Sequence, residues 1–139
     1  MRGTQTIVFT IERRRIKIDL VTYKNLSNST AYIAITSFGV GTQSGFSESL
    51  SQATKDGVSR LIIDLRNDGG GDLEEVSGIL NYFVPINGVK VRTRTVTNTD
   101  ELFSTGLSGI GANTKVIFLA NKGTASASEI LIGTVQDAL

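Results

Sequence analysis

The sequence contains neither cysteine nor histidine. The lack of cysteine excludes disulfides and thiolate metal sites. The lack of histidine excludes a Ser-His-Asp triad, and it excludes any histidine-ligated metal within these residues. A hydrolytic site in this chain would need a lysine or a carboxylate as its base.

An excess of charge of one sign is also missing, because 14 basic residues face 13 acidic ones and leave a net charge of +1. The basic cluster Arg13–Arg15 has no aromatic residues interleaved with it, so we expect no nucleic-acid surface there. No apolar run approaches the ~20 residues that cross a bilayer, and the N-terminus lacks the pattern of a signal peptide. The 139 residues, 40% of them hydrophobic, are typical of one globular domain.

Short runs rich in β-branched residues alternate with amphipathic segments along the chain. The patterns predict buried strands, helices, weaker strands and irregular connectors. The buried strands are predicted at 32–38, 61–65 and 116–120, and weaker strands at 6–11, 15–20 and 89–96. The helices are predicted around 46–53 up to Gly57, at 73–83 closed by Pro85, and from about 126 to the end. The irregular connectors are 24–30 and 97–114, the second with at most a short helix near 100–104. Buried strands that alternate with helices indicate an α/β fold with a largely parallel sheet, whose ligand site lies beyond the carboxyl ends of the strands.

One loop at such a strand end, Asn121–Ile130, reads NKGTASASEI and leads into the last helix. A serine at a helix start lies near free backbone N–H groups and the positive end of the helix dipole, which suits the oxyanion of acyl transfer. The stretch from Ser126 to Glu129 equally fits S-x-x-E, the capping box that begins many helices. Lys122 lies on the strand side of the turn, and we expect it to face solvent rather than act as a base.

The second such loop, Asn67–Asp72, contains three consecutive glycines. It matches neither common phosphate-binding glycine motif, so a phosphate cradle is a weak interpretation. Calcium binding by Asp64, Asp68 and Asp72 fails the EF-hand spacing. An oxyanion donor facing the serine loop and a tight turn without chemistry both stay open, and the turn is the simpler interpretation of this loop alone.

Taken together, LIIDLRNDGGGDL at 61–73 and GTASASEI at 123–130 resemble the peptidase core of the carboxyl-terminal processing (tail-specific) proteases, peptidase family S41. AYIAITSF at 31–38 and KVIFLAN at 115–121 look like core strands of that family, and GTQTIVFTIER at 3–13 looks like the end of the PDZ domain that precedes the core. The resemblance implies a PDZ remnant at 1–14 and an incomplete peptidase core at 15–139. The implied fold is a ClpP/crotonase-like core of ββα units.

The resemblance also implies roles for individual residues. Ser126 matches the nucleophile, and the backbone N–H groups of Gly70 or Gly71 and of Ala127 match the oxyanion donors. The positions that support the site are Arg66, Glu129 and Asp137. Because 11 helical residues rise about 16 Å, Asp137 cannot touch the Ser126 hydroxyl, and we expect it to act structurally if at all.

The family uses a Ser–Lys dyad, whose lysine lies in an F-G-K-G-like segment some two dozen residues after the serine. The 139 residues stop before such a segment, so we expect them to be inactive alone and to self-associate through exposed apolar residues of the last helix. The family implies unstructured protein C-termini as substrates, no metal or organic cofactor, and a periplasmic or otherwise extracytoplasmic location. Alternatives are a non-catalytic peptide- or ligand-binding module and a crotonase-like acyl-thioester enzyme, although the latter needs no seryl nucleophile.

Overall fold

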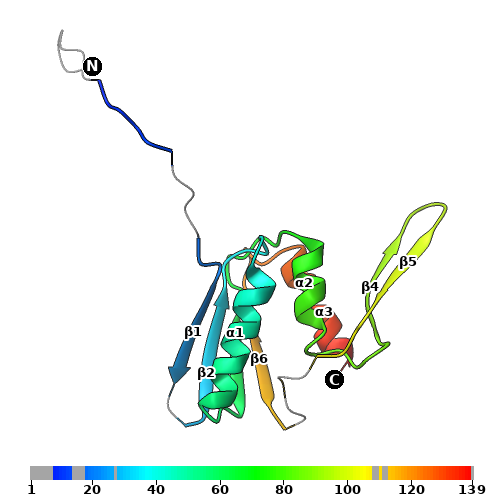
Figure 1. Cartoon of the computed structure of the whole chain (residues 1–139). Helices are drawn as coiled ribbons and strands as arrows, with labels where there is room; N and C mark the ends of the chain where they lie inside the picture. Colours follow the sequence, from blue (N-terminus) through cyan, green and yellow to red (C-terminus); the bar gives the residue numbers. More distant parts are fainter. Residues whose placement is uncertain (1–7, 14–17, 27, 108–109, 111–112, 139) are drawn as a thin grey trace.

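A four-stranded sheet in the order β1-β2-β3-β6 forms the centre of the structure (Figure 1). The computed structural model describes residues 8–13, 18–26, 28–107, 110 and 113–138. Strands β2 (Thr30–Ile35), β3 (Arg60–Asp64) and β6 (Lys115–Leu119) run parallel, and β1 (Val21–Leu26) adds to the edge in antiparallel direction. The predicted α/β class with a mostly parallel sheet is confirmed.

The helices α1 (Thr42–Lys55), α2 (Leu73–Leu80) and α3 (Ala127–Ala138) pack on one face of the sheet. Alternate strand residues point into this core, and the helices contribute their apolar faces. The fully buried members include Ile33, Ile35, Ile63 and Leu65 from the sheet side, and Phe46, Leu50, Ile79, Leu131 and Val135 from the helices. Gly57, which has a φ of 65°, follows the end of α1 as the sequence predicts.

The N-terminal part differs from the prediction. Residues 8–13 are extended chain outside any strand, and β1 begins only at Val21, so the strands predicted at 6–11 and 15–20 are wrong where the structure describes them. Residues 1–7 and 14–17 lie outside the described residues. Instead, β1 includes residues 24–26 of the predicted connector, because these residues pair with Tyr32, Ala31 and Thr30 of β2, in that order. Strand pairing, rather than local polarity, decides this boundary.

A second correction concerns residues 97–114. Thr99–Phe103 is strand β5, which pairs antiparallel with β4 (Val89–Arg94), and the hairpin projects from the body of the molecule (Figure 1). The short helix expected near residues 100–104 is therefore wrong. A tight turn closes the hairpin, where the Thr95 N–H donates to the Asn98 carbonyl at 2.8 Å. Helix α2 is also shorter than predicted, since it ends at Leu80 and its chain continues through turns to Pro85.

Candidate active site

Two loops lie side by side at the carboxyl ends of the neighbouring strands β3 and β6. The last residue of β3, Asp64, stands opposite Leu119 of β6 in parallel register. The chain leaves β3 through the glycine loop and enters α2, and it leaves β6 through the serine loop and enters α3. This placement follows the general rule for ligand sites in parallel sheets.

Ser126 immediately precedes α3 and adopts a left-handed backbone conformation with a φ of 55°. A helix N-cap residue normally has extended backbone angles, so this serine is no ordinary cap. Its N–H donates to Glu129 Oε2 at 2.8 Å, and this hydrogen bond is one half of the predicted capping box. Within the described part of the chain its exposed hydroxyl makes no hydrogen bond. A serine turned outward on such a bend presents its Oγ to a substrate.

Backbone contacts join the glycine loop directly to the serine loop. The Ala125 N–H donates to the Asp68 carbonyl at 3.0 Å, and Ser128 Oγ donates to the same oxygen at 3.1 Å. Thr124 Oγ1 donates to the Leu65 carbonyl at 2.8 Å. These contacts hold Ser126 against the glycine loop.

The amide side chains of Asn67 and Asn121 complete this connection. The Asn67 N–H donates to Asn121 Oδ1 at 2.9 Å, and Asn121 Nδ2 donates to Asn67 Oδ1 at 3.0 Å. The Gly123 N–H donates to the same Asn121 Oδ1 at 2.9 Å. Side-chain amides at both loops therefore satisfy backbone groups that the strands leave unpaired.

Gly70 lies closest to the serine. A Cβ on Gly70 would approach Ser126 Cβ, the Ala127 nitrogen and the Ala125 carbonyl oxygen, each to 2.8 Å, and its φ is 95°. Gly71 lies against Phe38, because a Cβ there would collide with the Phe38 carbonyl. Glycine at both positions is required by space and by backbone angle.

The backbone N–H groups of this region differ in their availability. The Gly70 N–H donates to Asp68 Oδ1 at 2.8 Å and is therefore already engaged. Among the described residues, the N–H groups of Gly71 and Ala127 have no hydrogen-bond partner. Of the three amides that the sequence nominates, Gly71 and Ala127 are the ones free to bind an anion.

The Arg66 side chain turns back onto Asp64, the last residue of β3. Its guanidinium forms a two-nitrogen contact with the Asp64 carboxylate, in which Nη2 lies 2.6 Å from Oδ2 and Nε lies 2.9 Å from Oδ1. Tyr32 also donates to Asp64 Oδ2 at 2.6 Å. Hydrogen bonds from Arg66 and then Tyr32 hold the pKa of Asp64 far below its ordinary value, against the effect of burial. Arg66 therefore fixes the end of β3 where the glycine loop begins.

The sequence profile described as peptidase family S41 matches residues 29–139. The chain belongs to peptidase family S41. It is 32% identical over 137 residues to a probable CtpA-like serine protease of Staphylococcus haemolyticus, covering 98% of this chain and 27% of that protein. It is 28% identical to a chloroplastic C-terminal processing peptidase of Tetradesmus obliquus, covering 97% of this chain and 31% of the relative. The chain thus spans about a third or less of the length of these relatives.

Solved structures give the same picture. The photosystem II D1 C-terminal processing protease superposes with a TM-score of 0.76 and 27% identity, over 90% of this chain and 36% of that one. A peptidase from Parabacteroides merdae superposes with a TM-score of 0.70 over 88% of this chain and 42% of its own, and its 22% identity supports the fold alone. The resemblance of the two loops to the S41 peptidase core is therefore confirmed.

No base contacts the Ser126 hydroxyl in the part of this S41 chain that the structure describes. Lys122 is exposed and makes no hydrogen bond to the serine. Asp137 is exposed in the last turn of α3, and it makes no hydrogen bond or ion pair with any described residue. The contacts therefore assign Asp137 no role at the serine.

Lys90 is a buried lysine that the sequence analysis missed. It lies in β4, and its Nζ donates to Asn81 Oδ1 at 2.9 Å and to the Ser77 carbonyl at 3.1 Å. Burial lowers the pKa of Lys90. Ser77 lies in the second half of α2 and Asn81 directly follows this helix, whereas Ser126 contacts the loop before α2. Lys90 therefore fastens β4 of the hairpin to the end of α2. The alternating pattern of residues 89–96 hides such a residue, because a lysine in a half-exposed strand normally faces water.

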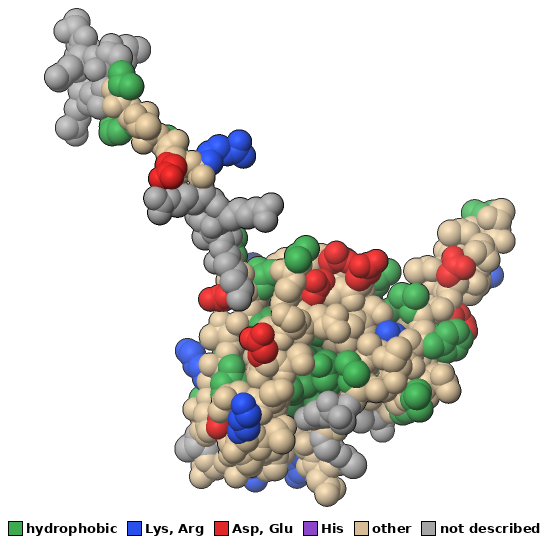
Figure 2. Space-filling model, viewed as in Figure 1, with side chains coloured by type: hydrophobic (Ala, Val, Ile, Leu, Met, Phe, Trp, Pro, Cys, Tyr) green, Lys and Arg blue, Asp and Glu red, His purple; other side chains and the backbone are tan. Residues whose placement is uncertain are grey.

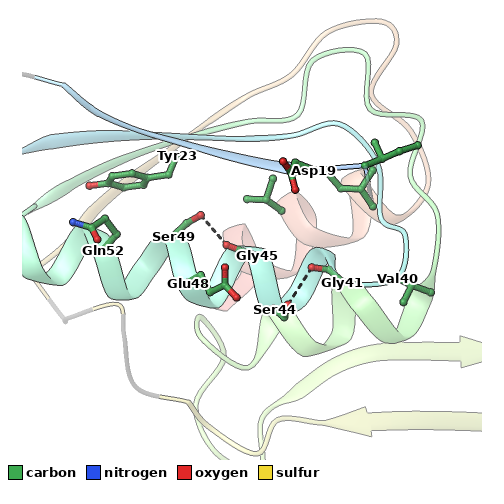
Figure 3. Close-up of a pocket in the computed structure, with 12 residues that line it drawn as sticks. Asp19, Tyr23, Val40, Gly41, Ser44, Gly45, Glu48, Ser49 and Gln52 are labelled. Atoms are coloured by element: carbon green, nitrogen blue, oxygen red, sulfur yellow. Dashed lines mark hydrogen bonds between the residues drawn. The ribbon is translucent and has the colours of Figure 1, made fainter. Parts of the chain in front are cut away.

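Two of the grooves in the described part of the chain flank α3 and α1. One of about 370 Å³ lies between α3 and β4, beginning one turn beyond Ser126 at Glu129 and Ile130. The other, of about 560 Å³, lies between α1 and the chain from Ile18 to Tyr23, with Ser44, Glu48 and Gln52 on its helical side (Figure 3). Of these two, the first has walls that continue from the serine loop and from Leu73, at the start of α2.

Asp64, Asp68 and Asp72, whose spacing does not fit a calcium-binding loop, have separate surroundings. Asp64 pairs with Arg66, and Asp72 caps α2 by accepting the Glu74 N–H at 2.8 Å. Asp68 is buried beneath the glycine loop. Across the residues with described positions, no three acidic side chains gather as a metal site, and no helix is long and apolar enough to cross a membrane.

Proposed function

We propose that these residues carry the nucleophile and oxyanion site of a serine endopeptidase that cleaves polypeptides near their C-termini. The observation that carries the proposal is the position of Ser126. Within the described residues, its hydroxyl is unengaged in a left-handed bend that lies against Gly70, and the N–H groups of the adjoining Gly71 and Ala127 have no partner. The family, and the names of the relatives from Staphylococcus haemolyticus and Tetradesmus obliquus, support this activity.

In the proposed reaction, Ser126 Oγ bonds to the carbonyl carbon of the scissile peptide while its proton passes to a base. The N–H groups of Gly71 and Ala127 stabilise the negative oxygen that results. The C–N bond then breaks, the amine leaves with the proton, and an acyl ester remains on Ser126. Water attacks this ester by the same route and releases the new carboxyl terminus.

We propose that the substrate chain lies in the groove between α3 and β4. The groove starts at Glu129 and Ile130, and its other wall is formed by Lys90–Thr93. A groove of about 370 Å³ suits an unstructured protein C-terminus better than a folded domain. The Arg92 side chain at its rim pairs with Glu101 at 2.6 Å, so little free positive charge is left to select an acidic tail.

We also propose that the base is a lysine of the family's dyad, outside residues 1–139, and that these residues alone are inactive. The absence of a base in contact with Ser126 among the described residues supports this. Base assistance contributes ~10²–10⁴ in rate.

A further proposal, from the names of relatives such as the chloroplastic peptidase, is an extracytoplasmic or lumenal location. That residues 1–14 end a PDZ domain is a proposal too, and residues 1–7 and 14 lie outside the described residues.

Incubation of the full-length protein with a polypeptide that has an unstructured C-terminal tail tests the activity. We expect cleavage near that terminus, and loss of cleavage in Ser126→Ala; unchanged cleavage by this variant would refute the assignment. A fluorophosphonate probe should label Ser126 in the full-length protein and leave residues 1–139 unlabelled. Labelling of the 139-residue chain would show that it holds its own base.

The second candidate is a non-catalytic peptide- or ligand-binding module on the same core. The observation that favours it is the serine hydroxyl without a base among the described residues. The same experiment separates the two candidates. A full-length protein that binds tails but neither cleaves them nor reacts with the probe is a binding module.

A further inference from the structure

Asp68 is a fully buried carboxylic acid at the centre of the site, with an exposed fraction of 0%. Its Oδ1 accepts the Gly70 N–H at 2.8 Å, and its backbone carbonyl accepts the Ala125 N–H and Ser128 Oγ. Its Oδ2 is buried and, among the described residues, has no hydrogen-bond partner.

An ionised carboxylate in this position would be costly, because buried charges need an opposite charge or several donors. No such charge contacts Asp68 among the residues that the structure describes. Arg66 is paired with Asp64, and Glu129 from α3 accepts the Ser126 N–H. From its own loop Asp68 meets Gly70 and Leu65, and from the serine loop and α3 it meets Ala125 and Ser128. Burial raises the pKa of Asp68, against hydrogen bonds from Gly70 and Ser128 that lower it, and this favours the protonated form.

We propose that Asp68 is a positioning residue that acts as a neutral carboxylic acid. It engages the Gly70 N–H and holds the glycine loop against Ser126 and Ala127. The amides of Gly71 and Ala127 are then the pair left to bind the oxyanion. The role in catalysis rests on the proposed peptidase function, whereas the protonation and the holding of the loop do not.

The neutral form has a consequence for pH. A group whose pKa is raised in the folded state stabilises the fold below its unfolded pKa of about 4, and this contribution is lost as pH rises through the folded pKa. Ionisation would also place a negative charge beside the developing oxyanion. Both effects weaken the site as Asp68 loses its proton.

Two variants and one direct measurement test the proposal. Asparagine has the shape of a protonated aspartate, and its carbonyl can still accept the Gly70 N–H. In the full-length protein we therefore expect Asp68→Asn to retain kcat within about threefold. Asp68→Ala should lower kcat by roughly 10–100-fold with KM little changed, which is less than the ~10²–10³ lost with an oxyanion donor. The fall in rate that follows Asp68 ionisation should be absent from the pH profile of Asp68→Asn.

The direct measurement uses the ¹³Cγ chemical shift of Asp68 in the 139-residue chain, with amide exchange at Gly70 as a second readout. We expect the shift of a protonated carboxyl at pH values above the ordinary pKa of an aspartate, about 4, and fast Gly70 exchange only in Asp68→Ala. An Asp68 that ionises at or below the ordinary aspartate pKa of about 4, or equal losses of kcat in both variants, overturns the proposal. If Ser126→Ala cleaves as well as the unaltered protein, the peptidase function has failed while these two readouts still decide the state of Asp68. They also decide it if Asp68→Ala does not fold, because the chemical shift needs no variant.

Discussion

At the scale of single residues, the site depends on where a side chain is absent. Gly69, Gly70 and Gly71 look equivalent in sequence, but their surroundings differ. A Cβ at Gly69 would meet nothing within 4 Å, and one at Gly70 would press on Ser126 and the Ala127 nitrogen. The middle glycine therefore sets how closely the two loops approach.

We predict that Gly70→Ala destabilises the chain and Gly69→Ala does not. Backbone strain at a φ of 95° costs roughly 1–3 kcal/mol, and the contact with backbone atoms adds to this because those atoms cannot rotate away. Urea unfolding of both variants measures the difference. Equal stability of the two would mean that the loops separate without cost.

A second residue-scale prediction concerns Asp64, whose carboxylate is buried while the Arg66 side chain is 52% exposed. The pKa of Asp64 is lowered in the folded state, so its contribution to stability is present above the unfolded pKa of about 4 and is lost as pH falls below that. Asp64→Asn should therefore flatten the loss of stability on acidification, as measured by urea midpoints between neutral pH and pH 2. Glu101→Gln, in an exposed ion pair with Arg92, is the control, and its stability at neutral pH should change by less than about 0.5 kcal/mol. If the slope of Asp64→Asn matches that of the unaltered chain, the pairing with Arg66 contributes nothing.

At the scale of secondary-structure elements, α1 depends on another helix for its start. Its N-cap is Gly41, which has no side chain to accept a hydrogen bond. Glu75 of α2 replaces that cap, since its two carboxylate oxygens accept the N–H groups of Gly41 and Gln43 at 2.9 and 2.7 Å. Figure 2 shows acidic side chains gathered at this end of the molecule, where the first turn of α2 carries Glu74 and Glu75.

We predict that Glu75→Ala lowers the free energy of unfolding by about 0.5–2 kcal/mol, the usual effect of losing a cap. Glu74→Ala is the matched control, because Glu74 is exposed and its side chain makes no hydrogen bond within the described structure. Thermal or urea unfolding suffices for both. A larger effect at Glu74 than at Glu75 would contradict the assignment of the cap.

The link between the two loops gives a further prediction at this scale. Thr124 Oγ1 donates to the Leu65 carbonyl and accepts the Asn121 N–H at 3.0 Å. Thr124→Val keeps the branched shape and removes both hydrogen bonds, so we expect a loss of ~1–3 kcal/mol. Hydrogen exchange should quicken at Ala125, whose amide reports the contact between the loops. Lys122→Ala, in the same loop and exposed, should change neither quantity.

At the scale of the whole molecule, the sheet has one covered face and one open face. Tyr32, Ile62 and Ile117 stand in one row on the side away from the helices, and Ile117 is 59% exposed on β6. Among the described strands, β6 pairs only with β3, so it presents an open edge. An apolar open edge recruits another strand.

Val135 of α3 is buried in the core, so the last helix does not offer the apolar surface expected there from the sequence. We therefore predict that the 139-residue chain self-associates through β6 instead and that Ile117→Glu weakens the association. Sedimentation velocity over a range of concentrations measures it. The control is Val96→Glu, which adds the same charge on the hairpin at a fully exposed position and should leave the association unchanged. A chain that sediments as a monomer at high concentration would refute the prediction.

Much of the fold follows from local patterns. The apolar β-branched runs at 30–35, 60–64 and 115–119 are strands because their side chains must be buried on the core face, and that demand is visible in sequence. The periodicity of Phe46, Leu50 and Ala53 predicts the buried face of α1 for the same reason. The paired loop motifs predict family S41, because their residues are constrained by the chemistry of the site rather than by the fold alone.

Tertiary structure decided the rest, because it depends on partners distant in the chain. β5 is a strand only because β4 lies beside it, and residues 8–13 remain outside any strand because no described strand pairs with them. Which glycine N–H is engaged depends on how Asp68 is buried, and the loop sequence alone leaves all three glycines alike. Sequence by itself determined which residues form the two loops. Only tertiary packing determined that Ser126 turns outward, that Asp68 turns inward, and that the N–H groups of Gly71 and Ala127 have no partner among the described residues, because burial and hydrogen bonding are properties of neighbours in space.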